Sequence, residues 1–521
     1  MSHAIDGHHD GELERRMSNE TRFAVAPDTL PNACLAVVEH LNARLALMVG
    51  EDERASSGMF RLSYTFAVAQ GQWLTLETLI DPAEPAFPSV TPLVPAAHWY
   101  EREVQDMFGL TAVGHPDPRR LVHHDDWPDG LHPLRKDFDP SLPVPRVDRP
   151  AETFHTLHGE GFVEIPVGPI HAGVIEPGHF RFAAVGEAVF DLQPRLFYTH
   201  RGIEKLAEGK TPAQVLQLAE RVCGACSCSH GVSYSQAVET LAGIEVPPRA
   251  AAVRTLYLEL ERLYNHLGDL GNICAGVSFA AGASFGAQLK EAVQRLNERV
   301  AGNRFLHGVN QIGGVRRDPS ASDLHDIAAT TTHIATEFRS FIEMMLSSDT
   351  VLERLKTTGF LPAATARALG AVGVAARASG VDVDSRRDHP HAGYPALPMP
   401  TPVVVRSEGD VYARVLVRSD EILATLAMIR AVLDTLPDGP AAVSPGRVPG
   451  GRAAFAVSES PRGENIHFVR TAPDGTIERY RVRSASYPNW PAVAACVPGN
   501  MVPDFPVINK SFELCYACLD R

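Results

Sequence analysis

The chain has 521 residues, of which 45% are hydrophobic and 21% charged, and its formal net charge is −14. Such a composition is typical of a globular protein with two or three domains. The negative charge argues against a nucleic-acid partner and against direct adhesion to an anionic membrane. No run approaches the ~20 apolar residues that a membrane span needs. The polar residues 1–17 contain no apolar stretch of an export signal, so we expect a cytoplasmic protein.

Residues 22–138 are predicted to form a mixed α+β domain. Residues 31–47 show helical spacing of apolar side chains, whereas residues 60–68 and 72–79 alternate like strands that pair with each other. Residues 139–153 follow as a linker, because four prolines at that density disfavour regular structure.

Residues 154–521 are predicted to form a mainly α-helical domain with small β-sheets at its two ends. The apolar residues of its helical segments recur on one face, and those of its strand-like segments are short runs. We expect helices at residues 251–270, 287–306 and 322–347, and strands at residues 161–167, 180–185, 402–416 and 453–482.

Two cysteine pairs carry the strongest chemical signal in the chain. Cys223 and Cys226 form one C-x-x-C pair, and Cys515 and Cys518 form another near the end of the sequence. Four thiols in two such pairs can close one site for a soft metal. By spacing alone, a structural zinc site is as well supported as any catalytic metal.

Several motifs in the first domain carry a family resemblance. Residues 99–109 read W-Y-E-R-E-V-Q-D-M-F-G, and they are followed by G-H-P at 114–116, R-R at 119–120 and H-P-L-R-K-D-F at 132–138. In order and spacing, these motifs resemble the signature of the complex I 30-kDa subunit family.

The second domain resembles the complex I 49-kDa subunit and the nickel–iron hydrogenase large subunit. The matching motifs are G-P-I-H at 168–171, H-R-G-I-E-K at 200–205, E-R-V-C-G at 220–224 and A-R-A-S-G at 376–380. The fusion of both parts, with both cysteine pairs present, resembles the large subunit of a group 4, formate-hydrogenlyase-type hydrogenase. The 49-kDa subunit of respiratory complex I lacks the cysteine pairs, so these pairs separate the two relatives.

The resemblance gives the four cysteines distinct roles at a nickel–iron centre. Cys223 and Cys515 are implied to be terminal nickel ligands, whereas Cys226 and Cys518 are implied to bridge nickel to an iron that carries cyanide and carbon monoxide. Thiolate sulfur suits both metals because soft donors match soft metals. Together with the surrounding motifs, nickel–iron is favoured over zinc.

Three further residues resemble active-site residues of the family. Arg462, in S-P-R-G-E, matches an arginine poised over the open metal position, where a guanidinium can stabilise developing charge and hydrogen-bond a cyanide. Ser486 matches a hydroxyl residue that hydrogen-bonds a cyanide. Glu176 matches the glutamate that relays protons from a terminal cysteine, here Cys515, and a carboxylate held out of water beside thiolates suits that task. The alternatives are a solvated loop arginine, a loop serine and a surface glutamate before a Pro-Gly turn.

Glu204 matches a glutamate that holds a magnesium ion near the C-terminus of related hydrogenases. The usual histidine partner is replaced here by Arg521, which cannot ligate a metal. An ion pair between Glu204 and Arg521 can therefore stand in for the magnesium.

The resemblance implies an oxidoreductase that interconverts dihydrogen with protons and electrons. Its expected partners are an iron–sulfur small subunit of the complex I 20-kDa type with a four-iron cluster, membrane-embedded complex I-like subunits, and a formate dehydrogenase or another electron donor. The chain would lie on the inner face of the cell membrane. Two alternatives stay open: a complex I-like NAD(P)H or quinone oxidoreductase subunit without a metal, and a scaffold stapled by a four-cysteine zinc site.

Overall fold

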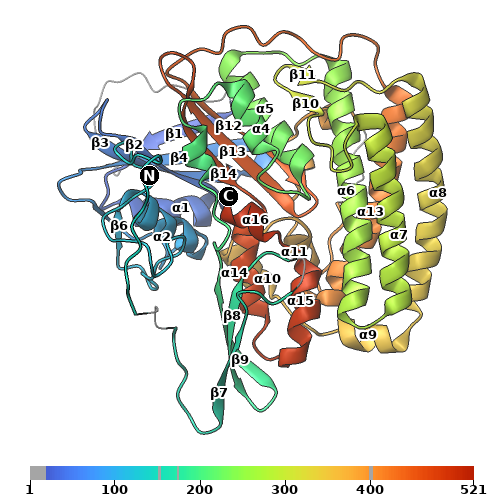
Figure 1. The fold of residues 1–521 in the computed structure, drawn as a ribbon, viewed down its shortest axis with the longest axis horizontal. Helices are drawn as coiled ribbons and strands as arrows, with labels where there is room; N and C mark the ends of the chain where they lie inside the picture. Colours follow the sequence, from blue (N-terminus) through green and yellow to red (C-terminus); the bar gives the residue numbers. More distant parts are fainter. Residues whose placement is uncertain (1–18, 151–153, 173–174, 398–402) are drawn as a thin grey trace. The chain divides into compact units, whose positions relative to one another are not determined.

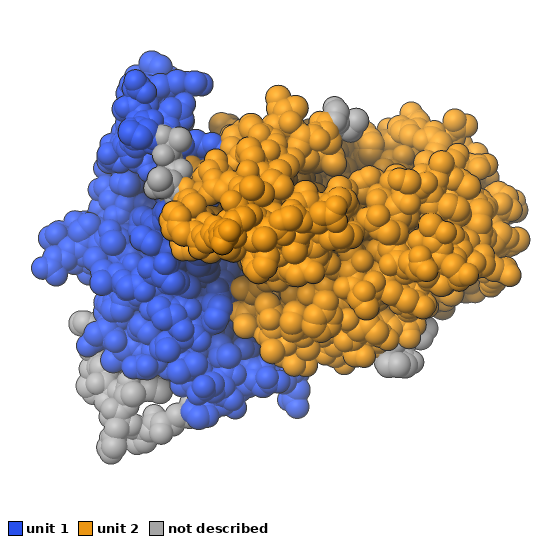
Figure 2. Space-filling view, turned by 90° about the horizontal axis from the view of Figure 1, so that it is seen from below, with its two compact units in different colours: residues 1–153 blue, residues 154–521 orange. Residues whose placement is uncertain are grey.

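The computed structural model describes residues 19–150, 154–172, 175–397 and 403–521. The chain divides into two compact units, Met1–Thr153 and Phe154–Arg521 (Figure 2). Toward the end of the first unit, residues 139–150 contain no helix or strand. The predicted signal-free start and the last residues of the predicted linker lie outside the described residues. Within these ranges, no helix is both long and apolar enough to cross a membrane.

The first unit is built on a four-stranded sheet with helix α1 (Leu30–Leu41) against it. The predicted pairing of residues 60–68 with 72–79 is confirmed, and the two strands run antiparallel. The sheet has the order β1 (Glu20–Ala24), β4 (Gln72–Ile80), β3 (Met59–Val68) and β2 (Arg44–Glu53), with β1 parallel to β4. Helix α2 (His98–Phe108) and the short strands β5 (Ala86–Pro88) and β6 (Thr111–Val113) complete it.

The predicted helix over residues 31–47 is wrong in its last third. Helix α1 ends at Leu41 because Asn42 adopts a left-handed conformation with φ of 47°. Strand β2 then begins at Arg44. Residues 45–49 are all buried, so this apolar run is covered on both faces, and a run covered on both faces loses the alternation that identifies a strand.

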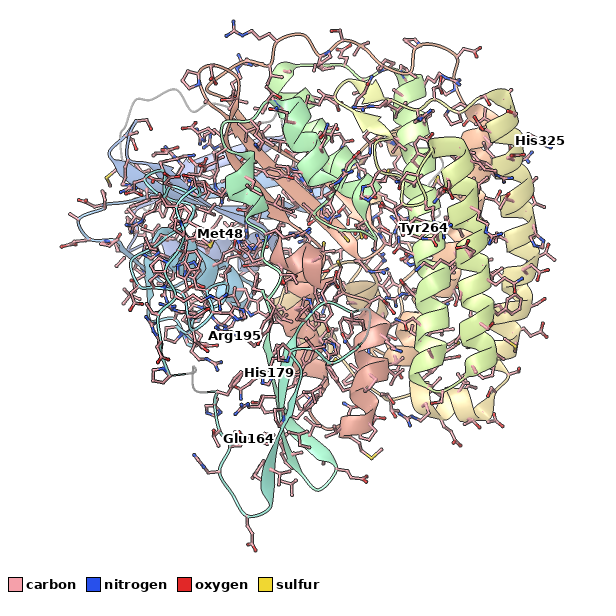
Figure 3. All side chains as sticks on the ribbon, viewed as in Figure 1. Met48, Glu164, His179, Arg195, Tyr264 and His325 are labelled. Atoms are coloured by element: carbon pink, nitrogen blue, oxygen red, sulfur yellow. The ribbon has the colours of Figure 1, made fainter. Side chains whose placement is uncertain are left out.

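The second unit contains two three-stranded antiparallel sheets and a hairpin of two short strands. The first sheet joins β7 (Phe162–Val167), β8 (His179–Val185) and β9 (Ala188–Arg195), and Figure 3 labels one residue on each of these strands. The second joins β12 (Ala453–Ser460), β13 (Gly463–Thr471) and β14 (Ile477–Arg483). The hairpin is β10 (Asn310–Gln311) with β11 (Gly314–Val315). The strands predicted at 161–167, 180–185 and 453–482 are therefore confirmed.

Four long helices pack side by side in the second unit (Figure 1). They are α6 (Pro248–Gly276), α7 (Ala280–Ala301), α8 (Ala321–Leu346) and α13 (Val411–Thr435). Helices α6 and α7 meet at two glycines, since a Cβ on Gly286 would lie 2.6 Å from the Cα of Gly271. The three predicted helices correspond to α6, α7 and α8, although α7 ends at Ala301 because Gly302 turns left-handed.

The strand predicted over residues 402–416 is wrong. Helix α13 begins at Val411, and the Asp410 side chain caps it by accepting a hydrogen bond from the Ala413 backbone N–H. Apolar side chains alternate with polar ones here because Arg414 and Arg418 are buried ion-pairing and hydrogen-bonding residues. A buried arginine breaks the polar-outside rule on which the strand prediction rested.

Short helices complete the second unit. Those that carry or support the site are α3 (Ile203–Ala207), α4 (Pro212–Ala219), α5 (Ser227–Ala242), α14 (Ser486–Cys496), α15 (Phe505–Phe512) and α16 (Tyr516–Asp520). The others are α9 (Asp349–Leu355), α10 (Ala363–Ala368), α11 (Gly373–Ala378) and α12 (Ser385–Asp388). Helix α5 packs across β12 and β13, which brings residues more than 200 positions apart into contact (Figure 1).

Candidate metal centre

Each cysteine pair sits at the start of a helix. Cys226 is the N-cap residue of α5, and Cys515 is the N-cap residue of α16. The Cys223 sulfur accepts backbone N–H hydrogen bonds from residues 225 and 226 at 3.3 Å, and the Cys515 sulfur accepts one from Cys518 at 3.3 Å. Backbone N–H groups at a helix start favour negative charge, so both loops are suited to hold thiolates.

The first cysteine loop is held from the side by helix α6. Tyr264 and Asn265 both donate hydrogen bonds to the carbonyl oxygen of Ala225, each at 2.8 Å (Figure 3 labels Tyr264). Below the loop, Glu261 accepts hydrogen bonds from the backbone N–H groups of Cys228 and Ser229. These contacts fix the position of the pair before any metal is bound.

Cys223, Cys226 and Cys518 belong to one buried cluster, the partly buried Cys515 packs against it, and the four thiols interact with one another. Hydrogen bonds from Cys226, Cys515 and Cys518 hold the pKa of Cys223 well below its usual range. In the described part of the chain, no three His, Cys, Asp or Glu side chains have the geometry of a ready metal site. The donor set nevertheless fits a soft metal, because four converging thiols with one readily ionised member supply sulfur ligands only.

A cavity of about 370 Å³ opens beside the cysteine cluster. Its lining includes Glu176, Arg462 and Cys515, so the structure brings together three residues that the sequence placed in one site. Asp269 of α6 and Glu513 also line it. The cavity therefore combines a thiol, carboxylates and a guanidinium beside the cluster.

Arg462 lies in the turn between β12 and β13 and is buried. Its guanidinium donates to both carboxylate oxygens of Asp269, at 2.5 and 2.9 Å, and to the side-chain oxygen of Asn265 at 3.3 Å. Burial opposes the charge, but Asp269 and the Cys226 sulfur raise the pKa of Arg462. The Nε atom of Arg462 is buried, and among the described residues it has no hydrogen-bond partner. The Arg462 guanidinium is thus a fixed positive charge beside the cysteines, and its Nε–H has no partner among the described residues.

Ser486 and Glu176 approach the cluster at Cys515. The Ser486 oxygen accepts the backbone N–H of Cys515 at 3.2 Å, which leaves its own O–H proton free to donate. Glu176 is half-buried. The pKa of the Cys515 thiol is raised, first by the Cys223 sulfur and burial and further by the charge of Glu176. Glu176 and Cys515 line the same cavity, so the carboxylate and the thiol share one open space.

Behind the cluster, a row of hydrogen bonds leads away from Cys518. Its sulfur lies 3.4 Å from Nε2 of His230, whose Nδ1 lies 2.8 Å from Nε2 of His467. The Nδ1 atom of His467 in turn lies 2.8 Å from the hydroxyl of Tyr480. All four side chains are buried. This side of the cluster is closed, whereas the side of Arg462 faces the cavity.

Glu204, which the sequence predicts as a metal ligand, is surrounded by arginine side chains in the structure. Its carboxylate is paired with the guanidinium groups of Arg479 at 2.9 Å, Arg481 at 3.1 Å and Arg521 at 3.0 Å. Burial opposes ionisation, but these three cations hold the pKa of Glu204 well below its usual range. A magnesium site needs oxygen ligands, so these residues do not fit magnesium. The predicted ion pair between Glu204 and Arg521 is present.

Sequence reasoning missed Asp269, Asn265 and His230. Asp269 and Asn265 lie one turn apart on α6, but this helix carries several other buried polar residues, so its sequence did not single these two out. His230 lies four residues after Cys226 on α5, so helical spacing alone places it next to the cysteine pair. The role of Glu513 as a cavity residue was likewise not predicted.

Family comparisons match three parts of the chain. Residues 277–448 and 442–521 match the respiratory-chain NADH dehydrogenase 49 Kd subunit, and residues 23–143 match the 30 Kd subunit. Residues 201–269, which include the first cysteine pair, match the nickel-dependent hydrogenases. Fold and site together thus define a subunit of the complex I 49-kDa class that carries hydrogenase cysteine pairs.

Individual relatives narrow this class. Formate hydrogenlyase subunit 5 of Escherichia coli is 40% identical over 92% of this chain and 84% of its own length. Hydrogenase-4 component G of the same organism is 37% identical over 98% and 89%. The chain belongs to the family of group 4, formate-hydrogenlyase-type nickel–iron hydrogenase large subunits, with fused complex I 30-kDa-like and 49-kDa-like parts.

Two more distant relatives share the architecture. An NADH-quinone oxidoreductase subunit of Phocaeicola vulgatus, of the C/D type, is 30% identical over 84% of this chain and 87% of its own length. Among solved structures, the membrane-bound sulfane sulfur reductase, an archaeal respiratory membrane complex, contains a chain with a TM-score of 0.65 and 29% identity. This likeness covers 70% of the present chain and 99% of that chain.

Proposed function

We propose that this chain is the catalytic large subunit of a membrane-associated hydrogenase that interconverts dihydrogen with protons and electrons at a nickel–iron centre. The observation that carries the proposal is the convergence of both cysteine pairs beside a cavity lined by Arg462 and Glu176. Membership of the hydrogenase family supports the same conclusion.

The four cysteines are the residues that would hold the metals. Cys223 and Cys515 are proposed as terminal nickel ligands, and Cys226 and Cys518 as bridges to an iron with cyanide and carbon monoxide ligands. When bound, such a centre polarises dihydrogen and takes up the two electrons released by its cleavage. The low pKa of Cys223 within the cluster supports ligation, since the thiolate is the form that binds metal.

Arg462 and Ser486 would act on the diatomic ligands and on charge in the cavity. The Asp269 carboxylate fixes the Arg462 guanidinium, so its positive charge is preorganised at the place where dihydrogen is polarised. The unpaired Nε–H of Arg462 and the free O–H of Ser486 are donors suited to cyanide nitrogen.

Glu176 would carry the proton away from the centre. Cleavage of one dihydrogen releases two protons and two electrons, and Cys515 is the proposed first acceptor of a proton. Cys515 and Glu176 line the same cavity, so a carboxylate is available there to take a proton from the thiol. Glu176 then hands the proton toward water through its exposed side.

The electrons need a partner. The remaining cysteines, Cys34, Cys228, Cys274 and Cys496, form no second set of cluster ligands in the sequence. We therefore propose an iron–sulfur small subunit of the complex I 20-kDa type with a four-iron cluster as the electron acceptor. Membrane-embedded complex I-like subunits would attach the chain to the inner, cytoplasmic face of the membrane. A formate dehydrogenase or another donor would supply electrons.

The metal-free oxidoreductase and the zinc scaffold are not favoured. A metal-free quinone subunit has no use for four converging thiols, and a zinc staple does not explain the cavity with Arg462 and Glu176.

The proposal is tested by infrared spectroscopy and metal analysis of the purified complex. We expect bands of metal-bound cyanide and carbon monoxide, nickel in stoichiometric amount, and dihydrogen uptake with a redox dye. Stoichiometric zinc without nickel, or quinone reduction without any dihydrogen activity, would overturn it.

A further inference from the structure

Asp269, the carboxylate that holds Arg462, is itself held by a second arginine. Arg418 of α13 donates from Nε to Oδ2 of Asp269 at 3.1 Å, and the same oxygen accepts a hydrogen bond from Nη1 of Arg462 at 2.5 Å. Nδ1 of His266 lies 3.6 Å from this oxygen, which is too far for a hydrogen bond. Burial opposes ionisation, but the charges of Arg462 and Arg418 hold the pKa of Asp269 well below its usual range. Among the described residues, the two guanidinium groups are therefore the donors that orient this carboxylate.

Arg418 reaches Asp269 without lining the cavity. The described residues that line the cavity include Asp269 and Arg462 but not Arg418, whose side chain is fully buried. Its other two nitrogens, Nη1 and Nη2, donate to the carbonyl oxygens of Arg414 and Phe512, each at 3.3 Å. A side chain with every nitrogen engaged and no place on the cavity wall can influence the cavity only through its neighbours.

The contact with Phe512 connects Arg418 to the second cysteine loop. Phe512 is the last residue of α15, and its carbonyl oxygen has no N–H partner within that helix. Glu513 follows in a left-handed conformation with φ of 51°, and Cys515 comes two residues later. Helices α6, α13 and α15 pack against one another (Figure 1). Arg418 thus joins the carboxylate that holds Arg462 to the backbone just before Cys515.

We propose that Arg418 is a positioning residue that fixes the plane of the Asp269 carboxylate and thereby the direction of the Arg462 guanidinium. The last torsion of an aspartate side chain is broad, so a carboxylate paired with one guanidinium can still turn together with it. A second charged donor on the same oxygen, anchored on another helix, removes this freedom. The preorganised charge at the cavity therefore depends on α13 as well as on α6.

Arg414 provides a matched control on the same helix. It lies one turn before Arg418, is equally buried, and supports the same segment by donating to Oγ of Ser511 at 2.8 Å and by lying over the Phe512 ring. Its other two nitrogens donate to backbone carbonyl oxygens, so its hydrogen bonds go to neutral groups. Arg418→Met and Arg414→Met each remove one buried guanidinium from α13, but only the first removes a donor to Asp269.

The first readout is ¹⁵N NMR of the arginine side chains in the full chain without metal, with Arg462→Lys to assign the signals. In the natural protein and in Arg414→Met, we expect separate signals for the Nη protons of Arg462, because two-point contact with a fixed carboxylate stops rotation of the guanidinium. In Arg418→Met these signals should merge. Separate signals in Arg418→Met, or merged signals in the natural protein or in Arg414→Met, would overturn the proposal. Arg418→Lys and Arg414→Lys repeat the comparison with a smaller change if a methionine variant does not fold.

The second readout rests on the proposed function and is dihydrogen turnover per bound nickel in the complex. Arg418→Met should lower kcat by about 10–10²-fold through misplacement of Arg462, with unchanged nickel content, whereas Arg414→Met should leave kcat unchanged. In an Asp269→Asn background, Arg418→Met should cause no further loss, because Arg418 acts through that carboxylate. Equal losses of kcat in Arg418→Met and Arg414→Met, or losses that multiply in the Asp269→Asn background, would overturn the positioning role. Absence of dihydrogen turnover in the natural complex, with the NMR result intact, would instead refute the proposed function.

Discussion

The cysteine cluster has two sides with opposite designs. On the cavity side, Arg462, Glu176 and Cys515 line open space, and the buried Nε–H of Arg462 has no hydrogen-bond partner among the described residues. On the closed side, Cys518 and the C-terminal helix are backed by fully buried groups that satisfy one another, such as His230 and the Glu204 ion pairs. The comparison shows that a buried cation at the cavity keeps one unpaired N–H group, whereas the imidazole and carboxylate groups behind Cys518 are paired.

The largest effect is expected from the cluster that joins the two sides. Cys515→Ala should remove a ligand of the metal centre, with loss of nickel and of all detectable dihydrogen activity. Elemental analysis and a dye-linked uptake assay measure both. Cys34→Ala, in the first unit, is the matched control and should retain both. Full nickel content in Cys515→Ala would remove this residue from the ligand set.

On the cavity side, Glu176→Gln should lower turnover by about 10²–10⁴-fold, because general acid–base relays contribute that much. The infrared bands of the centre should stay, since the carboxylate is not a ligand. Glu187→Gln, on the exposed turn between β8 and β9, is the control. Full activity of Glu176→Gln would refute the relay role.

Arg462→Lys should lower turnover by about 10²–10³-fold, comparable to the loss of one preorganised donor. Lysine keeps the charge but cannot make the two-point contact with Asp269. Steady-state kinetics on the nickel-loaded complex measure the loss. Arg452→Lys, at an exposed position, should change nothing. An active Arg462→Lys enzyme would mean that charge alone is sufficient there.

On the closed side, Glu204→Gln should destabilise the fold by about 3–5 kcal/mol, because three buried guanidinium groups lose their shared carboxylate. Urea unfolding of the full chain measures this free energy of unfolding. Glu164→Gln, which breaks a partly exposed pair with Arg181, should cost only about 0–1 kcal/mol. Equal losses of unfolding free energy in Glu204→Gln and Glu164→Gln would contradict the proposed stabilising role of the Glu204 ion pairs.

The ion pairs of Glu204 also predict how the stability of the fold depends on pH. The pKa of Glu204 is lowered in the folded chain, so the folded state binds this proton less readily than the unfolded state. Its contribution to stability is therefore complete well above about pH 4, the ordinary glutamate pKa, and is lost as the pH falls through the folded value. The gap in unfolding free energy between the natural protein and Glu204→Gln should stay constant from pH 8 to 6 and shrink below about pH 4. A gap that widens on acidification would show the opposite sign.

The sequence was most informative about local geometry. A C-x-x-C pair at the start of a helix can be identified from the sequence alone, because the two thiols and the backbone N–H groups around them lie within a few residues of one another. Local signals failed for residues 42–47 and 411–416. In the first segment, burial on both faces removed the alternation of apolar and polar residues that identifies a strand. In the second segment, buried arginines such as Arg414 disturbed the helical spacing of apolar residues.

The sequence by itself determined the class of protein and the four cysteines that are proposed as sulfur donors, since these lie in short motifs whose chemistry depends on adjacent residues. Only the tertiary structure decided what surrounds the donors. Arg462, Cys518 and Glu204 find partners that lie 193, 288 and 317 positions away along the chain. Such contacts depend on how helices α5 and α6 pack against the second sheet, and no local pattern encodes them.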